Sequence, residues 1–264
     1  RIIKSYETGR LDPRADLGPE IYVPTTLANL PKSIVHLILA SVKRLPAILY
    51  HLAPHLLVLI LFTMAAIQNG GLALGDKENH TLALHLPQTL YFSGTTLALT
   101  PIWFLFSARD LLRGLCNSGV LTVCAAALSA TAIAVAMIFK GTIVHPFLLA
   151  DNRHFTFYIW RRLLNGFRGY GRYLAAPVYV VSLVSMCAQL AKSTVFRSLL
   201  RQVLLFGAIA AVLTPSPLFE FRYFITPFFL MYVHYKPASV VEGLAQLTFS
   251  LCVNAGVLWI FLYK

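Results

Sequence analysis

The sequence predicts an all-α protein, a polytopic transmembrane helical bundle. Three observations predict it: 58% of the 264 residues are hydrophobic, only 12% are charged, and the mean hydropathy is +0.70. Soluble domains carry about 25% charged residues, and one of this length could not hide so much apolar surface from water. Lipid is therefore the expected solvent for most of the chain.

The apolar residues gather into stretches along the chain. A helix crosses a bilayer with ~17–25 apolar residues, and stretches near 52–68, 88–106, 119–139, 173–191 and 244–262 meet this length. Two shorter stretches, 202–214 and 223–235, flank a Pro-rich turn and are compatible with a helical hairpin or a partly re-entrant pair. The stretch 34–50 is interrupted by Lys43, Arg44 and Pro46, which favours an interfacial helix over a span.

Residues 1–33 form a separate, polar segment. Arg10, Asp12, Arg14 and Asp16 lie close together there, and this composition is typical of a cytoplasmic loop or tail with little fixed structure. Residues 34–264 are predicted to form one multi-span membrane domain with luminal site loops. The chain opens with Arg1 rather than Met, and we expect it to be part of a longer protein.

The basic residues predict the orientation of the spans. The formal charge of +12 is spread over short loops rather than one soluble face, so no nucleic acid is expected as a partner. Short cytoplasmic loops are enriched in Lys and Arg, which assigns the basic loops 107–118 and 192–201 to the cytoplasm. The glycosylation sequon at Asn79 agrees with the lumen for its own loop. By alternation, three segments face the lumen: 69–87, 140–172 and 214–222.

Segment 140–172 breaks this rule, because it holds six basic residues against the single acid Asp151. A luminal binding site for phosphate would account for them, since Arg offers a rigid fork of donors to phosphate oxygens. The alternative is that this segment is cytoplasmic and the assigned orientation is wrong. The basic residues are Lys140, Arg153, Arg161, Arg162, Arg168 and Arg172.

Polar clusters beside apolar spans are functional candidates, because burying polar groups unpaired is costly. The first cluster contains Asp76, Lys77 and His80 and could bind a polar head group; the alternative is a solvated hairpin loop. The second runs from His145 to Arg162, and simple neutralisation of Asp151 by Arg153 is its alternative. Its other candidates are Asn152, His154, Tyr158 and Arg161.

The third cluster is Glu220 and Arg222, after the Pro-rich turn. Residues two apart share a face only in an extended strand, and a local salt bridge is the alternative to a binding role. The sequence has no Asp-x-Asp pair and no histidines at ligand spacing, so no metal is expected. It also has no nucleotide-binding signature, and no cofactor is predicted.

Three runs in these clusters resemble a known family. They are HPFLLADNRHFTFYIWRR (145–162), LGDKENHTLALHLPQ (74–88) and EFRYFITP (220–227), and the family is the dolichyl-phosphate-glucose-dependent alpha-1,2-glucosyltransferases of asparagine-linked glycosylation. The resemblance covers roughly residues 34–264. It implies a partial GT-C-like glycosyltransferase fold in the endoplasmic reticulum membrane, multi-pass, with a luminal active site.

The resemblance also implies substrates and a reaction. The donor would be dolichyl-phosphate glucose, the acceptor a diglucosylated dolichyl-diphosphate oligosaccharide, and the product a terminal alpha-1,2 linkage formed with inversion, all within membrane lipid. Inversion needs a general base on the acceptor hydroxyl, and cations stabilise a phosphate leaving group. In GT-C enzymes the base is usually an acid in the first luminal loop, which we expect upstream of this chain, so the chain alone is expected to be inactive.

The resemblance distributes roles among the candidate residues. Arg153 and Arg161 are expected to bind phosphate, and Asp151 to orient Arg153 or bind a sugar hydroxyl. His145, Asn152 and His154 are expected to serve the sugar and the local architecture. The remaining predicted binding residues are Tyr158, Arg162, Asp76, Lys77, His80, Glu220 and Arg222.

Two rival functions stay open from the residues alone. A non-catalytic transporter or channel-associated protein would place charged residues inside its spans, facing a pathway. Most charges of this chain lie in loops instead, which favours a head-group site. A related lipid-linked transferase that uses another sugar is the second rival, because sugar specificity depends on pocket contacts that a sequence does not display.

Overall fold

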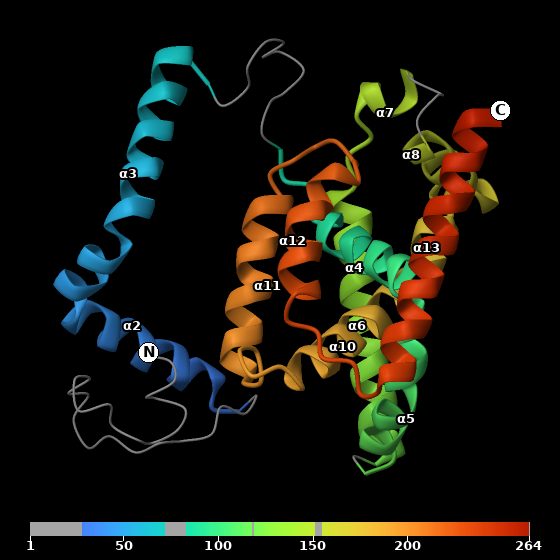
Figure 1. Cartoon of the computed structure of the whole chain (residues 1–264), viewed down its shortest axis with the longest axis horizontal. Helices are drawn as coiled ribbons and strands as arrows, with labels where there is room; N and C mark the ends of the chain where they lie inside the picture. Colours follow the sequence, from blue (N-terminus) through green and yellow to red (C-terminus); the bar gives the residue numbers. More distant parts are fainter. Residues whose placement is uncertain (1–27, 72–82, 118, 151–154, 264) are drawn as a thin grey trace. The chain divides into compact units, whose positions relative to one another are not determined.

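The structure, a computed structural model, describes residues 28–71, 83–117, 119–150 and 155–263, and Figure 1 traces the helices along the chain. The described residues contain helices and no strands. Four helices are long and apolar enough to cross a bilayer, or five if one bent pair counts as a span. The predicted all-α polytopic membrane protein is confirmed.

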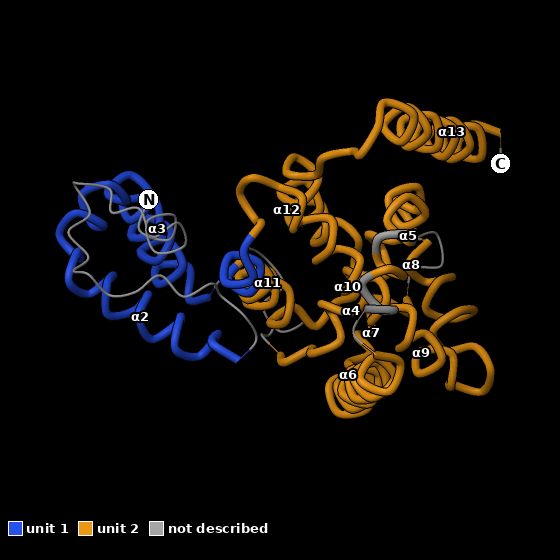
Figure 2. Tube along the Cα trace, turned by 90° about the horizontal axis from the view of Figure 1, so that it is seen from below, with its two compact units in different colours: residues 1–81, 198–204 blue, residues 82–197, 205–264 orange. Residues whose placement is uncertain are grey.

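The chain divides into two compact units, which Figure 2 colours separately. Unit 1 comprises residues 1–81 and 198–204, and unit 2 comprises residues 82–197 and 205–264. The division passes through α11 (Leu199–Leu213), a shorter apolar helix. All of the predicted site residues that the structure describes belong to unit 2.

Unit 1 contains α2 (Leu30–Lys43) and α3 (Leu45–Asn69). At 1.5 Å per residue the 25 residues of α3 extend about 37 Å, more than the ~30 Å hydrocarbon core of a bilayer. Pro46 stands in the first turn of α3, where its missing N–H costs no hydrogen bond, and Gly70 ends the helix with a left-handed φ of 70°. The stretch 34–50, predicted as one interfacial helix, is divided in the structure: α2 ends at Lys43, and residues 45–50 belong to the candidate span α3.

Unit 2 is built around α10, which packs against α4, α5 and α6. The Ser182 hydroxyl of α10 donates to the Ser93 carbonyl of α4 at 2.6 Å. Small residues and side-chain hydrogen bonds hold helices together in lipid, where the hydrophobic effect gives no preference for helix over lipid tail. The helices are α4 (Gln88–Leu99), α5 (Pro101–Asn117), α6 (Val120–Gly141), α7 (Pro146–Ala150), α8 (Phe155–Tyr158), α9 (Gly171–Leu174), α10 (Ala176–Ala191), α12 (Arg222–Tyr232) and α13 (Val240–Tyr263).

The predicted span over 88–106 is broken, because α4 and α5 meet at an angle of 85°, and the pair is either a broken span or a re-entrant loop. Pro101 has no N–H to continue the helix, which leaves carbonyls of α4 without helical donors. Gln246 of α13 donates to the Leu99 carbonyl at 3.0 Å. Gln189 of α10 donates to the Trp103 carbonyl, also at 3.0 Å. Neighbouring helices thus supply donors at the break, which is the condition for a broken helix at membrane depth.

The two ends of unit 2 differ in the segments that they collect. Figure 1 shows α7, α8 and the loop before α12 at one end, together with the C-terminal end of α13. The loops after α5 and after α12 lie at the opposite end. Among the described residues of unit 2, parts of the predicted luminal segments 140–172 and 214–222 therefore share one end.

Candidate functional site

His85 and Gln88 fasten the start of α4 to the Pro-rich turn before α12. The backbone N–H of fully buried His85 donates to the Thr214 carbonyl at 2.8 Å, and its Nδ1–H donates to the Pro217 carbonyl at 3.1 Å. The amide nitrogen of Gln88 donates to the carbonyls of Ser216 at 3.1 Å and Leu218 at 2.8 Å. These bonds join two of the three predicted luminal segments into one piece.

The burial of His85 also fixes its charge. Loss of hydration lowers its pKa from 6.5 to about 4, and this effect outweighs the carbonyls of Pro217 and Ser216, which act in the opposite direction. The ring is therefore neutral at physiological pH, with its proton on Nδ1 and an acceptor lone pair on Nε2.

Aromatic side chains attach the third luminal segment to the same turn. Phe155 and Trp160 lie 4.9 and 6.5 Å from the rings of Phe221 and Phe219 respectively, measured between ring centroids. Tyr91 contacts Phe219 from the α4 side at 5.1 Å. Phe219, only 3% exposed, thus joins the Pro-rich turn to α4 and to segment 140–172.

The arginine-rich part of this segment has an unusual backbone. After α8 the chain forms a π-helical turn (Ile159–Leu164), a helix type that occurs mostly as single turns at functional sites. Phe167 and Arg168 follow with positive φ values of 52° and 60°, which are strained for residues with a side chain. At Gly171, a Cβ would lie 2.0 Å from the Leu163 carbonyl oxygen, so only glycine lets the chain fold back so closely.

Each of three guanidinium groups lies over an aromatic ring. Arg161 is 5.8 Å from the ring centroid of Phe157, and Arg162 is 5.4 Å from that of Tyr158. Arg161 and Arg162 are exposed, and no carboxylate among the described residues forms an ion pair with either. Stacking orients their donors at modest cost, and the pair can therefore receive an anion.

Arg172, the third stacked arginine, extends the cationic region towards the core. Its charge acts on the Tyr91 hydroxyl. That hydroxyl lies beside Thr142 but forms no hydrogen bond of normal geometry among the described residues. The Nε atom of Arg172 and the Nε2 atom of His85 are likewise buried without a partner in the part of the chain that the structure describes. Unpaired buried polar atoms are rare in native proteins, and here they lie beside three stacked arginines, which mark this end of unit 2 as the candidate site.

Sequence reasoning counted Arg172 among the basic residues of segment 140–172 but gave no specific role to it, to His85 or to Gln88, and it did not single out Tyr91. His85 and Gln88 lie in the LHLPQ part of a run that carries the family resemblance, and Arg172 belongs to the excess of arginines in segment 140–172. Those two patterns were the available signals. No sequence signal distinguishes Tyr91, because tyrosines in apolar stretches are also common at the membrane interface.

Three predicted residues have mainly local contacts: His145, Glu220 and Arg222. Nδ1 of His145, which is 8% exposed, accepts the backbone N–H of Phe147 at 3.2 Å and orders the start of α7. Arg222 and Glu220 form a two-bond ion pair, with Nε to Oε1 at 2.5 Å and Nη2 to Oε2 at 2.6 Å. The salt bridge that the sequence left open is thus present, and it neutralises Arg222 beside the turn.

The other predicted residues cannot be placed. Asp151, Asn152, Arg153 and His154 lie outside the described residues, between α7 and α8. The residues of the first polar cluster also lie outside them: Asp76, Lys77 and His80.

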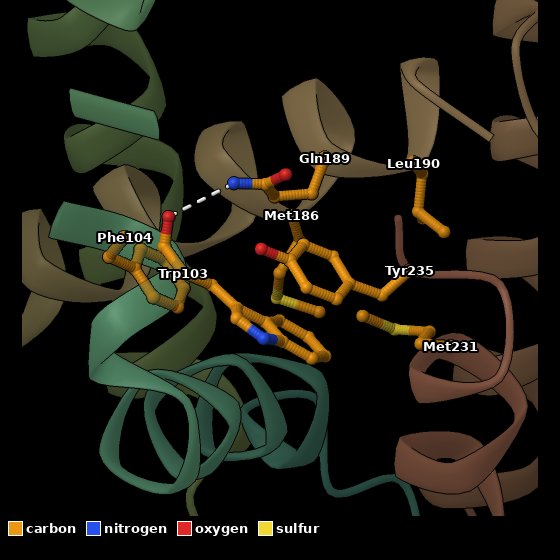
Figure 3. Close-up of a pocket in the computed structure, with 7 residues that line it drawn as sticks. All are labelled: Trp103, Phe104, Met186, Gln189, Leu190, Met231 and Tyr235. Atoms are coloured by element: carbon orange, nitrogen blue, oxygen red, sulfur yellow. Dashed lines mark hydrogen bonds between the residues drawn. The ribbon is translucent and has the colours of Figure 1, made fainter. Parts of the chain in front are cut away.

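A small cavity at the other end of unit 2 is not a substrate site. It encloses about 10 Å³, which is room for one water molecule. Figure 3 shows its lining, in which the Gln189 amide and the Tyr235 hydroxyl are the polar groups among apolar side chains. The amide oxygen of Gln189 and that hydroxyl have no hydrogen-bond partner among the described residues, and a sugar would not fit between them.

An apolar helical bundle with stacked arginines and aromatics at one end defines a polytopic membrane protein with a cationic candidate site. Residues 10–233 match the model of the DIE2/ALG10 family. The chain belongs to this family. No solved structure matches it.

Curated relatives from distant eukaryotes share the similarity, and each is named Dol-P-Glc:Glc(2)Man(9)GlcNAc(2)-PP-Dol alpha-1,2-glucosyltransferase. The Arabidopsis thaliana protein is 34% identical over 225 residues, which is 82% of this chain and 42% of that protein. A Homo sapiens protein is 32% identical over 80% of this chain and 43% of its own length. The Debaryomyces hansenii protein is 34% identical over 70% of this chain and 40% of its own length. The chain thus spans less than half the length of the relatives it matches.

Proposed function

We propose that this chain is the donor-phosphate and sugar-binding part of an enzyme that transfers glucose from dolichyl-phosphate glucose. The acceptor is the diglucosylated dolichyl-diphosphate oligosaccharide, and the product is the terminal alpha-1,2 linkage. The observation that carries the proposal is family membership, because the curated relatives bear this activity in their names. The apolar helices suit substrates whose dolichyl chains stay in membrane lipid.

The enzyme acts in the endoplasmic reticulum membrane, with its site in the lumen. The tendency of Lys and Arg to lie in cytoplasmic loops does not explain six basic residues in a luminal segment 140–172. Phosphate binding does explain them. The common end of the three segments in unit 2 supports their assignment to one compartment. The sequon at Asn79 supports the lumen as that compartment.

The reaction breaks the bond between the anomeric carbon and the phosphate oxygen of the donor. Negative charge grows on the departing lipid phosphate, and preorganised cations stabilise such charge most effectively in a partly dehydrated site. Arg161 and Arg162, stacked on Phe157 and Tyr158, supply this stabilisation together with Arg153. Their bidentate donors match phosphate oxygens.

The acceptor hydroxyl attacks from the opposite face and gives its proton to a general base, as inversion requires. We assign this base to an acidic residue of the parent protein outside this chain, as in a GT-C-like fold. Asp151 orients Arg153. Asn152, His154 and Tyr158 bind the sugar, Asp76, Lys77 and His80 also bind substrate, and His145 and the Glu220–Arg222 pair order the surrounding loops.

The test is a transfer assay with the full-length parent protein in microsomes that have no endogenous enzyme of this family. Radiolabelled dolichyl-phosphate glucose is the donor, and variants Arg153→Ala and Arg161→Ala are compared with wild type at matched expression. Loss of one charge-stabilising donor costs about 10²–10³ in turnover, and we expect losses of this order. Arg197→Ala is the matched control, because Arg197 is exposed and belongs to a loop assigned to the cytoplasm.

The outcomes separate the parts of the proposal. No transfer by the wild-type parent would overturn the activity and revive a non-catalytic transporter. Normal transfer by both arginine variants would keep the activity and remove these arginines from the phosphate site. Transfer from another lipid-phosphate sugar in preference to glucose would correct the donor alone.

A further inference from the structure

The surface of α2 is divided into two arcs. At about 100° per residue, the side chains that the structure leaves exposed fall within an arc of about 140°, and the half-buried or buried ones fill the rest. The exposed residues are Pro31, Lys32, Val35, Ile38, Leu39, Val42 and Lys43. The residues on the other arc are Ser33, Ile34, His36, Leu37, Ala40 and Ser41.

The exposed arc is apolar in its middle and cationic along one rim. Val35, Ile38, Leu39 and Val42 are 53–65% exposed. Lys32 and Lys43 lie eleven residues apart, about three helical turns, and so within about 20° of each other on the same rim. No acidic residue of α2 offsets them.

The position of α2 along the chain decides what covers this arc. Only Arg44 separates α2 from α3, and the two helices are in contact. None of the residues in the apolar window of α3 is buried, as expected of a helix surrounded by lipid. Since α3 enters the bilayer at its first turn, α2 must lie at the bilayer surface, on the side assigned to the cytoplasm.

We infer that the exposed arc of α2 is a binding surface for anionic phospholipids of the cytoplasmic leaflet. The apolar middle enters the boundary between head groups and acyl chains, and the lysines extend from the rim to the head-group phosphates and carboxylates. Anionic head groups complement this rim, whereas phosphatidylcholine has no net charge to offer. The surface is separate from the candidate luminal site and does not depend on the proposed reaction.

The experiment places a photoreactive benzophenone amino acid at Val42 of the full-length parent protein. The protein is reconstituted in nanodiscs of phosphatidylcholine and phosphatidylserine at a fixed ratio, irradiated, and its cross-linked lipids are identified by mass spectrometry. The same label at Val257, an exposed residue of the α13 span, reports lipid contact away from the proposed surface. The measured quantity is the ratio of cross-linked phosphatidylserine to phosphatidylcholine, divided by the bulk ratio.

We expect about five-fold enrichment of phosphatidylserine at Val42, from roughly 1 kcal/mol of attraction per basic residue near an anionic surface, and none at Val257. The double variant Lys32→Gln/Lys43→Gln should return the Val42 ratio to bulk. Arg113→Gln/Lys236→Gln removes the same charge from exposed positions of unit 2 and should keep the enrichment. A bulk ratio at Val42 in the wild type, enrichment that survives loss of the lysines, or cross-links to protein instead of lipid would each overturn the inference.

Discussion

Replacement of Gln88 by leucine should loosen the candidate site without touching a predicted substrate contact. Gln88 is 1% exposed, and its amide nitrogen donates to the carbonyls of both Ser216 and Leu218. Leucine has a similar volume but no donor, so the part-buried carbonyls of Ser216 and Leu218 lose the Gln88 donor. The substitution therefore tests the attachment of the Pro-rich turn to α4.

The free-energy change follows from three groups. An orphaned buried acceptor costs about 1–3 kcal/mol, so the two carbonyls together cost about 2–6 kcal/mol. The substitution also removes the Gln88 Oε1 atom, which is buried without a partner, and this returns about 1–3 kcal/mol. The net destabilisation should be about 2 kcal/mol.

The assay is the fraction of purified full-length protein that stays monodisperse after heating, measured by size-exclusion chromatography. Gln68→Leu is the control, because Gln68 is exposed on α3. We expect a midpoint lowered by several degrees for Gln88→Leu and an unchanged midpoint for the control. Equal midpoints would refute the reasoning, because they would mean that another donor satisfies the two carbonyls and that the turn does not depend on Gln88.

Three further predictions concern other contacts. The lowered pKa of His85 means that the unfolded chain takes up a proton near pH 6.5 while the folded chain does not. The free energy of unfolding should therefore fall by up to about 3 kcal/mol as the pH drops from 6.5 towards 4. The variant His85→Asn should flatten that dependence in the heating assay. Gly171→Ala forces a Cβ against the Leu163 carbonyl and should destabilise segment 140–172 by about 1–3 kcal/mol. Faster proteolysis in that segment and reduced glucose transfer would report the effect. Gly256→Ala, whose Cβ meets open space, should change neither readout. Gln246→Leu removes the donor to the Leu99 carbonyl and should cost about 0.6–1.7 kcal/mol; an unchanged heating midpoint would show that the break needs no donor from α13.

Much of the fold could be predicted because apolar length is a strong signal. Four predicted spans correspond to the long apolar helices α3, α6, α9 with α10, and α13. The predicted stretch 88–106 is broken at Pro101. A proline inside an apolar stretch can either kink a span or break it, and which of the two occurs depends on the donors that neighbouring helices supply. Here the decision depends on Gln189 and Gln246, whose donors come from 86 and 147 residues further along the chain.

The candidate site was less accessible to sequence reasoning. The arginine excess of segment 140–172 drew attention to Arg161 and Arg162, because charge composition is visible without structure, and their role stays a prediction. The attachment through His85 and Gln88 was not visible, because its acceptors are backbone carbonyls of residues 214–218. Any residue has such a carbonyl, and only the folded chain shows which ones lack a helical donor.

The bend between α4 and α5 has a consequence for how the protein is made. Gln246 follows Leu99 by 147 residues, and a ribosome that adds about 5–20 residues per second needs roughly 7–30 s to reach it. During that interval α13 has not been made and cannot donate to the Leu99 carbonyl. Water or the insertion machinery must supply a hydrogen-bond donor to that carbonyl instead. Termination of synthesis before α13 would leave that state permanent, so quality control has a defined unfinished intermediate to recognise.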